Sequence, residues 1–309
     1  RDLPDLPGRQ EGAANIHIGI NWLGSVAFEH TEKIGKSVIV LGGGNTAMDC
    51  CRTARRLGGE DVKVIVRSPF STMKASPWEK EDAMHEDIPI IDNHVPKTFV
   101  IEEGKLTGMT FEKVEAKYDD NGKRTLVPTG EPDVFYPADD VLIAVGQENA
   151  FPWIERTIGL EFDKWEMPVV DKTTFQSTHP KVFFGGDAAF GPENVITAVA
   201  HGHQAAVSID LFCNKKNLLT ERLHPMVNLV SQKMGIHEWA YDSEIDEYDR
   251  LVVPQAPKSK TLVNRKQEVE LGFDPLAGYE EAKRCLNCDV QTVFDAPKCI
   301  ECDACVDIC

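Results

Sequence analysis

One segment of the chain changes from an extended to a helical pattern and back around a cluster of glycines. Residues 36–41 form a short apolar run rich in β-branched residues, which predicts a buried parallel strand. The turn Gly42-Gly-Gly-Asn-Thr-Ala47 follows at once and fits the pattern G-x-G-x-x-A. Residues 46–57 have apolar residues at helical spacing, and residues 61–66 form a second apolar run. This order predicts a βαβ unit and places the chain in the α/β class.

The glycine turn has the chemistry of a dinucleotide site. Gly42 permits a tight turn, Gly44 lets backbone N–H groups approach a pyrophosphate, and Ala47 allows the helix to pack closely on the strand. The predicted contacts are Gly42, Gly43, Gly44, Asn45, Thr46 and Ala47. The second strand ends at Arg67 and Ser68, where an NAD site usually has an acidic residue. A guanidinium and a hydroxyl suit a 2′-phosphate, so NADP(H) is favoured; if Arg67 is only a surface cation, NAD(H) is the alternative.

Two later segments indicate a second nucleotide half-site. Another apolar strand ends at Gly146. Residues 181–184 predict a strand that leads into Gly186 and Asp187, and a helix is expected to begin near Pro192. A carboxylate in such a turn can accept hydrogen bonds from a sugar alcohol. The helix N-terminus behind it can stabilise negative charge on a reduced ring.

The end of the sequence contains a closely spaced run of cysteines. The run consists of Cys299, Cys302, Cys305 and Cys309. Its spacing, C-x2-C-x2-C-x3-C, is that of the ligands in a bacterial-type [4Fe–4S] ferredoxin module. We expect the first three cysteines to bind one cluster and Cys309 to bind a neighbouring cluster, because the fourth cysteine of such a run usually serves a second one. The run indicates electron transfer.

A further pair, Cys285 and Cys288, adds two candidate metal ligands. A structural zinc ribbon built from this pair and the first two cysteines of the terminal run is an alternative, but it leaves Cys305 and Cys309 without a metal. Three histidines lack partners at ligand spacing and are interpreted as surface or packing residues: His201, His203 and His237.

Composition excludes several classes of protein. The chain has 33 Lys and Arg against 50 Asp and Glu and a formal net charge of −17, which argues against a nucleic-acid partner. No apolar run approaches the roughly 18 residues that a membrane span requires. Six of the nine cysteines lie within residues 285–309. This clustering indicates metal ligation in a reducing compartment, so we expect a cytoplasmic protein.

Three motifs, at residues 42–54, 138–146 and 184–187, follow one another as they do in the glutamate synthase small-subunit family. Over residues 4–212 the chain resembles this family of FAD-dependent NAD(P)H oxidoreductases, which are related in fold to the pyridine nucleotide–disulfide oxidoreductases. Leu6-Pro7-Gly8 is similar to the family's connection out of the first half of the FAD domain.

The resemblance implies roles for individual residues. Asp187 would hold the ribityl chain of FAD, with Glu193, Asn194 and Val195 near the isoalloxazine. The segment Arg-Cys285-Leu-Asn-Cys288 is similar to an element that precedes iron–sulfur ligands in this family, although there it typically lies near the N-terminus.

The resemblance also implies an order of domains. Residues 1–21 would connect from the first half of an FAD domain, and residues 22–147 would be an inserted, Rossmann-like NAD(P)H domain. Residues 148–212 would be the second half of the FAD domain. Residues 213–284 are charged and rich in loops and are interpreted as a linker or docking region, followed by a ferredoxin-like iron–sulfur segment at 285–309. The FAD pyrophosphate motif of the family is not among the 309 residues, so a longer polypeptide or another chain is expected to supply it.

These features together predict an electron-transfer flavoprotein. Its cofactors, NADP(H), FAD and [4Fe–4S] clusters, would carry the chemistry, so no catalytic side chain is expected. The expected partner is ferredoxin or a larger catalytic subunit of the glutamate synthase or 2-oxoacid:ferredoxin oxidoreductase type, in a hetero-oligomer. One alternative is a disulfide reductase of the thioredoxin reductase type, for which the nucleotide domain offers only the adjacent Cys50 and Cys51. Another is a non-enzymatic iron–sulfur relay, against which the intact Gly42, Gly44 and Asp187 argue.

Overall fold

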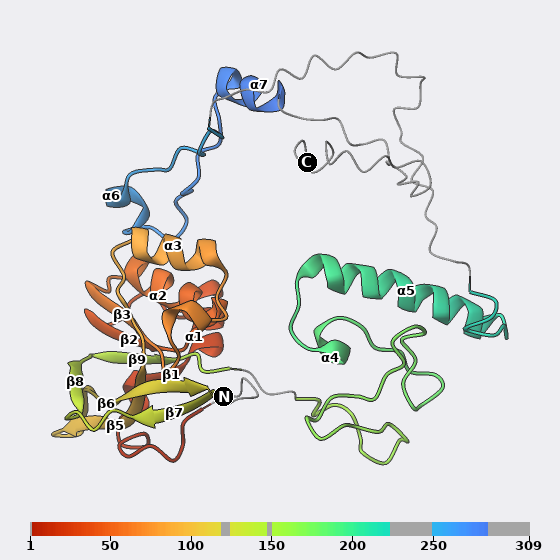
Figure 1. Ribbon diagram of the computed structural model, residues 1–309, viewed down its shortest axis with the longest axis horizontal. Helices are drawn as coiled ribbons and strands as arrows, with labels where there is room; N and C mark the ends of the chain where they lie inside the picture. The colour runs from red at the N-terminus through yellow and green to blue at the C-terminus, as the bar shows by residue number, and fades with distance from the viewer. Residues whose placement is uncertain (1, 119–123, 147–149, 223–248, 284–309) are drawn as a thin grey trace. The chain divides into compact units, whose positions relative to one another are not determined.

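The computed structural model describes residues 2–118, 124–146, 150–222 and 249–283 (Figure 1). The chain divides into two compact units. The first unit contains residues 1–148 and 253–272, and the second contains residues 149–252 and 273–309. None of the helices in the described residues is long and apolar enough to cross a membrane.

A five-stranded parallel sheet forms the centre of the first unit. Its strands lie in the order β1 (Ile16–Ile18), β9 (Asp140–Ile143), β2 (Ser37–Leu41), β3 (Asp61–Ile65) and β4 (Ile90–Ile91). Each neighbouring pair is parallel. Helix α2 (Asn45–Arg56) connects β2 to β3. The βαβ unit and the α/β class expected from the sequence are therefore confirmed.

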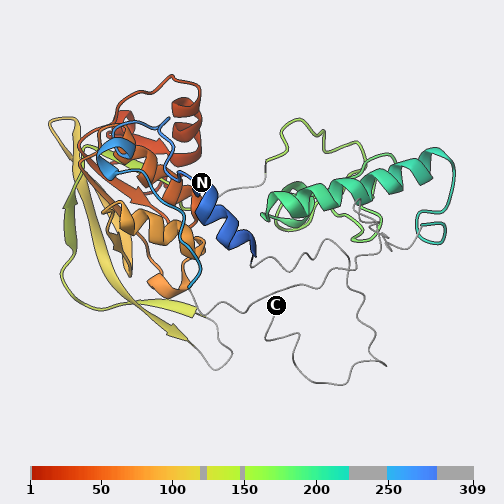
Figure 2. The same cartoon turned by 90° about the horizontal axis from the view of Figure 1, so that it is seen from above.

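Side chains of the central strands alternate between two separate cores. Val38 and Val40 pack with residues of α1 (Gly19–Ala27), α2 and α3 (Pro77–His85). Ile39 and Leu41 point to the other face and pack with Phe99 and neighbouring residues of an antiparallel sheet. The antiparallel strands are β5 (His94–Glu102), β6 (Lys105–Tyr118), β7 (Arg124–Pro128) and β8 (Val134–Pro137). The first unit thus has three layers, with helices and an antiparallel sheet on opposite faces of the parallel sheet (Figures 1 and 2).

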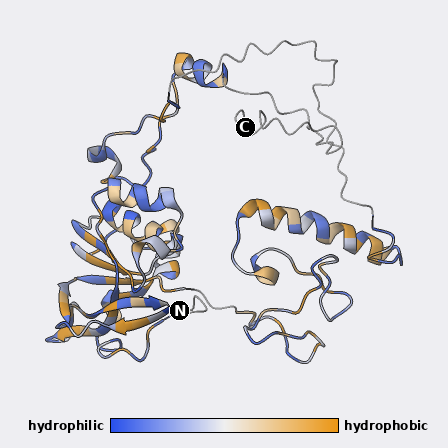
Figure 3. Cartoon of the chain, in the orientation of Figure 1, coloured by the Kyte–Doolittle hydropathy of each residue, from blue (hydrophilic) through white to orange (hydrophobic). Residues whose placement is uncertain are grey.

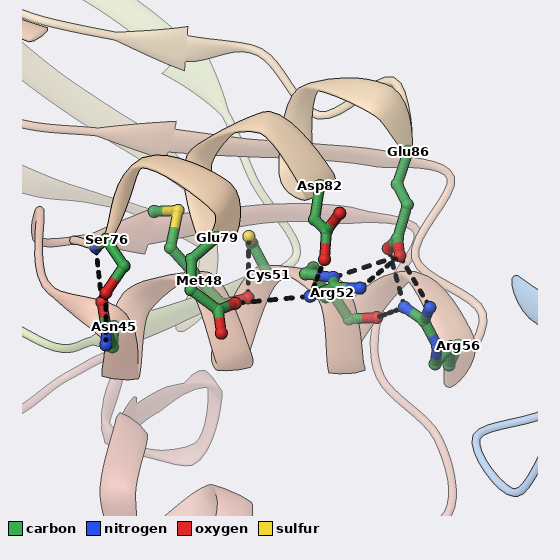
Figure 4. Close-up of polar contacts among 9 residues, drawn as sticks. All are labelled: Asn45, Met48, Cys51, Arg52, Arg56, Ser76, Glu79, Asp82 and Glu86. Carbon is green, nitrogen blue, oxygen red and sulfur yellow. Dashed lines mark hydrogen bonds and ion pairs between the residues drawn. The ribbon is translucent and has the colours of Figure 1, made fainter. Parts of the chain in front are cut away.

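Helix α3 is held against α2 by largely buried ion pairs. Both terminal nitrogens of Arg56 lie 2.7 Å from the carboxylate of Glu86, and Arg52 also pairs with it at 3.0 Å. Arg52 also forms ion pairs with Glu79 and Asp82 of α3 (Figure 4). Burial opposes the ionisation of Glu86, but the hydrogen bonds from the two arginines outweigh it and hold the pKa of Glu86 below its ordinary value.

The second unit is built from helices and irregular segments. The helices in its described residues are α4 (Asp187–Phe190), α5 (Val195–Cys213) and α7 (Pro275–Lys283). A small core forms around Ile154, Leu160, Phe184 and Ala189. Hydrophobic residues recur along α5 (Figure 3), and at its start Val195 and Ile196 are 78% and 81% exposed.

Of two sequence expectations in the second unit, the strand needs correction and the helix is confirmed. Residues 181–184 do not form a strand; Phe183 makes only an isolated bridge with Gln176. A strand requires a partner along its length, and the described residues of this unit offer only single bridging pairs here. The helix expected near Pro192 is present and begins at Val195, where the side chain of Asn194 caps it by accepting a hydrogen bond from the Thr197 N–H at 2.8 Å.

The first unit extends beyond the boundaries expected from the sequence. Strand β1 completes the parallel sheet beside β9, although residues 1–21 were expected to be a connection outside the nucleotide domain. Residues 253–272, which include α6 (Lys258–Thr261), were expected to be part of a linker but belong to this unit. Three ion pairs fasten them there: Lys258–Asp87, Arg265–Glu29 and Lys266–Glu29.

We expect Glu86→Gln to lower the free energy of unfolding by about 3 kcal/mol, because it leaves two arginines, 20% and 10% exposed, without their shared anion. Folding lowers the pKa of Glu86, so its stabilising contribution is complete above the ordinary value of 4.5 and is lost as pH falls through the folded-state pKa. Urea unfolding of the unmodified protein and the variant at neutral pH and at about pH 3 measures both effects. The difference in free energy of unfolding between the two proteins should be smaller at the acidic pH.

Glu81→Gln is the matched control, because Glu81 lies on the same helix and is exposed. Equal stability of the two variants at neutral pH would show that the ion pairs of Glu86 do not hold α3 in place.

Candidate functional site

The glycine loop lies where β2, β3 and β9 end. Gly42 follows β2 with a φ of 135°, and a Cβ at this residue would lie 2.2 Å from the carbonyl oxygen of Ala144. Only glycine can therefore occupy this position. The N–H of Gly42 donates to the carbonyl of Ile65 at 3.2 Å, and the N–H of Ala144 donates to Leu41 at 2.7 Å. Both neighbouring strands thus fix the turn.

Gly44, the N-cap residue of α2, faces open space. No atom lies within 4 Å of a Cβ built at Gly44, and the first turn of α2 has no acidic residue. Within the described part of the chain, the backbone N–H groups of Gly44, Asn45 and Thr46 have no hydrogen-bond acceptor. Exposed N–H groups at the positive end of a helix dipole favour an anion. The loop therefore has the room and the donors that a dinucleotide pyrophosphate requires.

Arg67 and Ser68 follow β3 at the same edge of the sheet. The Arg67 side chain is exposed, and it forms no hydrogen bond or ion pair with another described residue. Lys74, further along the same loop, is also exposed and unpaired within the described ranges. Sequence reasoning missed Lys74, whose only signal is its positive charge close to Arg67. Both cations are available to a phosphate group.

The loop from Arg67 to Ser76 is fastened to the glycine loop. The side-chain oxygen of Asn45 accepts a hydrogen bond from the Ser76 N–H at 2.8 Å, and its amide nitrogen donates to the Ser76 hydroxyl at 3.3 Å (Figure 4). The Ala75 N–H donates to the Gly43 carbonyl at 2.9 Å. Asn45 was predicted to contact the cofactor. Its side chain makes this clamp, which leaves its backbone N–H for a ligand.

In the second unit, Gly186 and Asp187 form the turn that begins α4. Gly186 has φ 61° and ψ −150°, a conformation essentially restricted to glycine. Asp187 is exposed, and one of its carboxylate oxygens accepts a hydrogen bond from the Glu193 N–H at 3.3 Å. Asn194 and Val195 follow directly at the start of α5. The structure therefore brings these five predicted residues together in one turn and helix start.

Gly146 belongs to the first unit, three positions after the end of β9. It is exposed, and its φ of 126° is one that favours glycine. The six cysteines predicted as metal ligands lie outside the described residues. Among the residues that are described, no group of three or more His, Cys, Asp or Glu side chains could hold a metal ion.

Cys50 and Cys51 are free thiols buried on α2. Burial, together with the charge of Asp49, raises the pKa of Cys50 to about 12, and burial also raises the pKa of Cys51. The Cys51 thiol donates a hydrogen bond to the Met48 carbonyl at 3.1 Å (Figure 4). Buried thiols that stay protonated are packing groups. This pair is therefore unsuited to thiol–disulfide exchange.

A pocket of about 250 Å³ includes Asp140, at the amino-terminal end of β9 and so opposite to the glycine loop. Asp140 accepts hydrogen bonds from the Gly35 N–H at 2.7 Å, from Asn15 at 3.0 Å and from His17 at 3.3 Å. Burial opposes ionisation of Asp140, but these hydrogen bonds outweigh it and lower the pKa. The carboxylate already has its partners, so it serves to fix the start of β9.

The parallel sheet, with its open glycine loop, defines a dinucleotide-binding protein. Residues 1–202 match the family model for the pyridine nucleotide-disulphide oxidoreductases. The chain belongs to this family. Similarity to glutamate synthase small chains confirms the narrower resemblance seen in the sequence.

Several curated proteins are similar over most of the chain. The β subunit of an NADP(+)-dependent formate dehydrogenase from Moorella thermoacetica is 33% identical over 289 residues, which are 92% of this chain and 40% of that protein. The NADPH-Fe(3+) oxidoreductase β subunit of Geobacter sulfurreducens is 28% identical over 299 residues, 87% of this chain and 44% of the relative. The Halomonas elongata glutamate synthase [NADPH] small chain is 35% identical over 215 residues, 66% of this chain and 45% of the relative. The chain spans less than half the length of each.

Solved structures share the fold. Thioredoxin reductase of T. acidophilum superposes with a TM-score of 0.52 at 20% identity, over 69% of this chain and 62% of that one. FprA of Mycobacterium tuberculosis in complex with NADPH gives a TM-score of 0.52 at 16% identity, over the same shares. These structures confirm an architecture with two dinucleotide-binding domains.

We expect Gly44→Ala to weaken NADP(H) binding at least about tenfold (~1.4 kcal/mol), because its methyl group enters the space that a pyrophosphate needs. Stability should fall by less than about 1 kcal/mol, because nothing in the chain contacts the new group. Gly42→Ala should instead prevent correct folding, because its methyl group meets a backbone carbonyl. Calorimetric titration with NADPH and thermal unfolding separate the two effects.

Gly24→Ala is a matched control, since a Cβ at Gly24 also meets nothing within 4 Å but lies on α1. Unchanged affinity for NADPH in the Gly44→Ala protein would show that the glycine loop does not bind the cofactor.

Proposed function

We propose that the chain belongs to an electron-transfer flavoprotein that moves electrons between NADP(H), FAD and [4Fe–4S] clusters. It would exchange these electrons with a larger catalytic subunit or with ferredoxin, in a cytoplasmic hetero-oligomer. When bound, the flavin would convert hydride transfer into single-electron steps that iron–sulfur clusters can carry.

The observation that carries the proposal is the open N-terminus of α2 beside two cations that have no partner among the described residues, in the same chain as the cysteine run at residues 299–309. Backbone N–H groups at Gly44, Asn45 and Thr46 would bind the pyrophosphate of NADP(H). Arg67 would bind the 2′-phosphate, with Ser68 as a hydroxyl donor. Because Arg67 and Lys74 are exposed and have no partner in the described ranges, NADP(H) is favoured as the cofactor over NAD(H).

The chain's other predicted site would hold FAD. Asp187 is exposed, and one of its carboxylate oxygens accepts a hydrogen bond from the Glu193 N–H. Its other carboxylate oxygen has no partner among the described residues and would accept hydrogen bonds from the ribityl chain. Asn194 and Val195 would lie near the isoalloxazine, where the N-terminus of α5 can stabilise negative charge. The protein's task is to bind and orient these groups.

The cysteines would receive or deliver the single electrons. Cys299, Cys302 and Cys305 would bind one [4Fe–4S] cluster, and Cys309 would bind a neighbouring one, with Cys285 and Cys288 as further ligands. The relatives from Moorella and Geobacter are named as β subunits, which supports a role within a complex of several subunits. Glutamate synthase-type and 2-oxoacid:ferredoxin oxidoreductase-type partners both agree with this chemistry.

A disulfide reductase of the thioredoxin reductase type is a weaker candidate. It needs an accessible redox pair beside the flavin, whereas Cys50 and Cys51 are buried and stay protonated. A non-enzymatic relay is also weaker, because it gives no reason for an open pyrophosphate cradle at Gly44.

Anaerobic titration of the complete protein with NADPH tests the proposal. Visible absorption should show bleaching of the flavin, and electron paramagnetic resonance should show a growing signal of reduced [4Fe–4S] clusters. NADH should be the poorer reductant. Flavin bleaching without a cluster signal would contradict electron transfer to the cysteines, and purified protein without flavin would favour the relay.

Three variants assign these steps to residues. Arg67→Gln should raise the NADPH concentration for half-reduction about tenfold (~1.4 kcal/mol) and leave that for NADH unchanged. Cys302→Ser should preserve flavin bleaching and diminish the cluster signal. Cys213→Ser, at an exposed cysteine outside the predicted ligands, should change neither.

A further inference from the structure

His201, in the second turn of α5, contacts the turn that contains Gly186. The N–H of Gly186 donates a hydrogen bond to Nδ1 of His201 at 3.1 Å. Turn and helix also approach closely, because a Cβ built at Gly185 would lie 3.0 Å from the Cβ of His201. The sequence suggested only a surface or packing role for this histidine. The contact joins two segments that are fifteen positions apart.

The ring of His201 is held between two phenylalanines. Its centroid lies 4.9 Å from that of Phe190 in an edge-on arrangement, and 5.2 Å from that of Phe175. The two phenylalanine rings are 5.6 Å apart and nearly perpendicular, so the three rings form one cluster. Phe175 is almost fully buried, and its φ of 60° is unusual for an aromatic residue. This backbone conformation places the Phe175 ring in the cluster, and the packing of the two phenylalanine rings fixes the position of the imidazole.

The direction of the hydrogen bond defines the state of the imidazole. A backbone N–H can only donate, so Nδ1 of His201 must be the unprotonated acceptor, and Nε2 carries the proton of the neutral ring. Gly186 has φ 61° and ψ −150°, and Asp187 is the next residue. Fixing the Gly186 amide therefore also fixes the direction in which the backbone presents Asp187.

We propose that His201 is a positioning residue for the flavin site. Its Nδ1 anchors the Gly186 amide and thereby holds Asp187 in the orientation that receives the ribityl hydroxyls of FAD. The inference rests on the proposed function, because Asp187 matters to a flavin only if this unit binds one. Polar atoms on a short turn bind a ligand well only when their own positions are fixed by neighbouring groups.

Two amide substitutions separate positioning from a merely structural role. In His201→Asn, the side-chain oxygen can take the place of Nδ1 as acceptor, whereas in His201→Gln the oxygen is one carbon further out. Positioning predicts that Asn retains FAD affinity within about twofold and that Gln weakens it about tenfold. Helix propensity predicts the opposite order, because Gln is the better helix former.

The test measures the FAD dissociation constant, the flavin absorption spectrum and thermal unfolding for the complete protein and its variants. Gln should also shift the flavin spectrum, and Asn should not. His203→Leu is the control, because His203 is exposed on the same helix and should leave all three unchanged. Equal FAD affinity in the Asn and Gln variants, or a better affinity in the Gln variant, would overturn the inference about His201. Absence of flavin from the unmodified protein would instead overturn the proposed function.

Discussion

The carbonyl of Ala144, which leaves no room for a side chain at Gly42, sets the geometry of the nucleotide edge. It forces the chain to turn sharply at the end of β2, so α2 begins directly above the sheet with its first N–H groups exposed. The neighbouring strand β3 ends at the same edge and is followed by the loop that contains Arg67 and Lys74. A single backbone constraint thus places phosphate-binding donors and cations on one side of the sheet.

The rest of the first unit makes this edge rigid and attractive to an anion. Ion pairs hold α3 against α2, and a separate clamp joins Asn45 to Ser76 (Figure 4). The loop is thereby held at its carboxyl end while its cations stay unpaired within the described residues. The chain as a whole carries a formal net charge of −17. The exposed cations Arg67 and Lys74 therefore give a phosphate a local site on a protein whose net charge otherwise repels it.

Sequence reasoning succeeded where the signal was local. Hydrophobic periodicity and the glycine spacing predicted β2, α2 and β3, because these elements follow from neighbouring residues. It failed where distant contacts decide the structure. The Asn45 clamp joins residues 31 positions apart, the role of His201 needs a turn fifteen positions earlier, and residues 253–272 join the first unit through ion pairs to Glu29 and Asp87. A strand at 181–184 was also overpredicted, since an apolar run cannot reveal whether a partner strand exists.

Amide hydrogen exchange of the complete protein, with and without NADPH, tests the central claim most directly. Binding at the open N-terminus of α2 should slow exchange at residues 42–47, and engagement of the 2′-phosphate should slow it in residues 67–76. NADH should protect the first segment and leave the second nearly unchanged, because it lacks that phosphate. Unchanged exchange in both segments, under conditions where NADPH still reduces the flavin, would contradict the account.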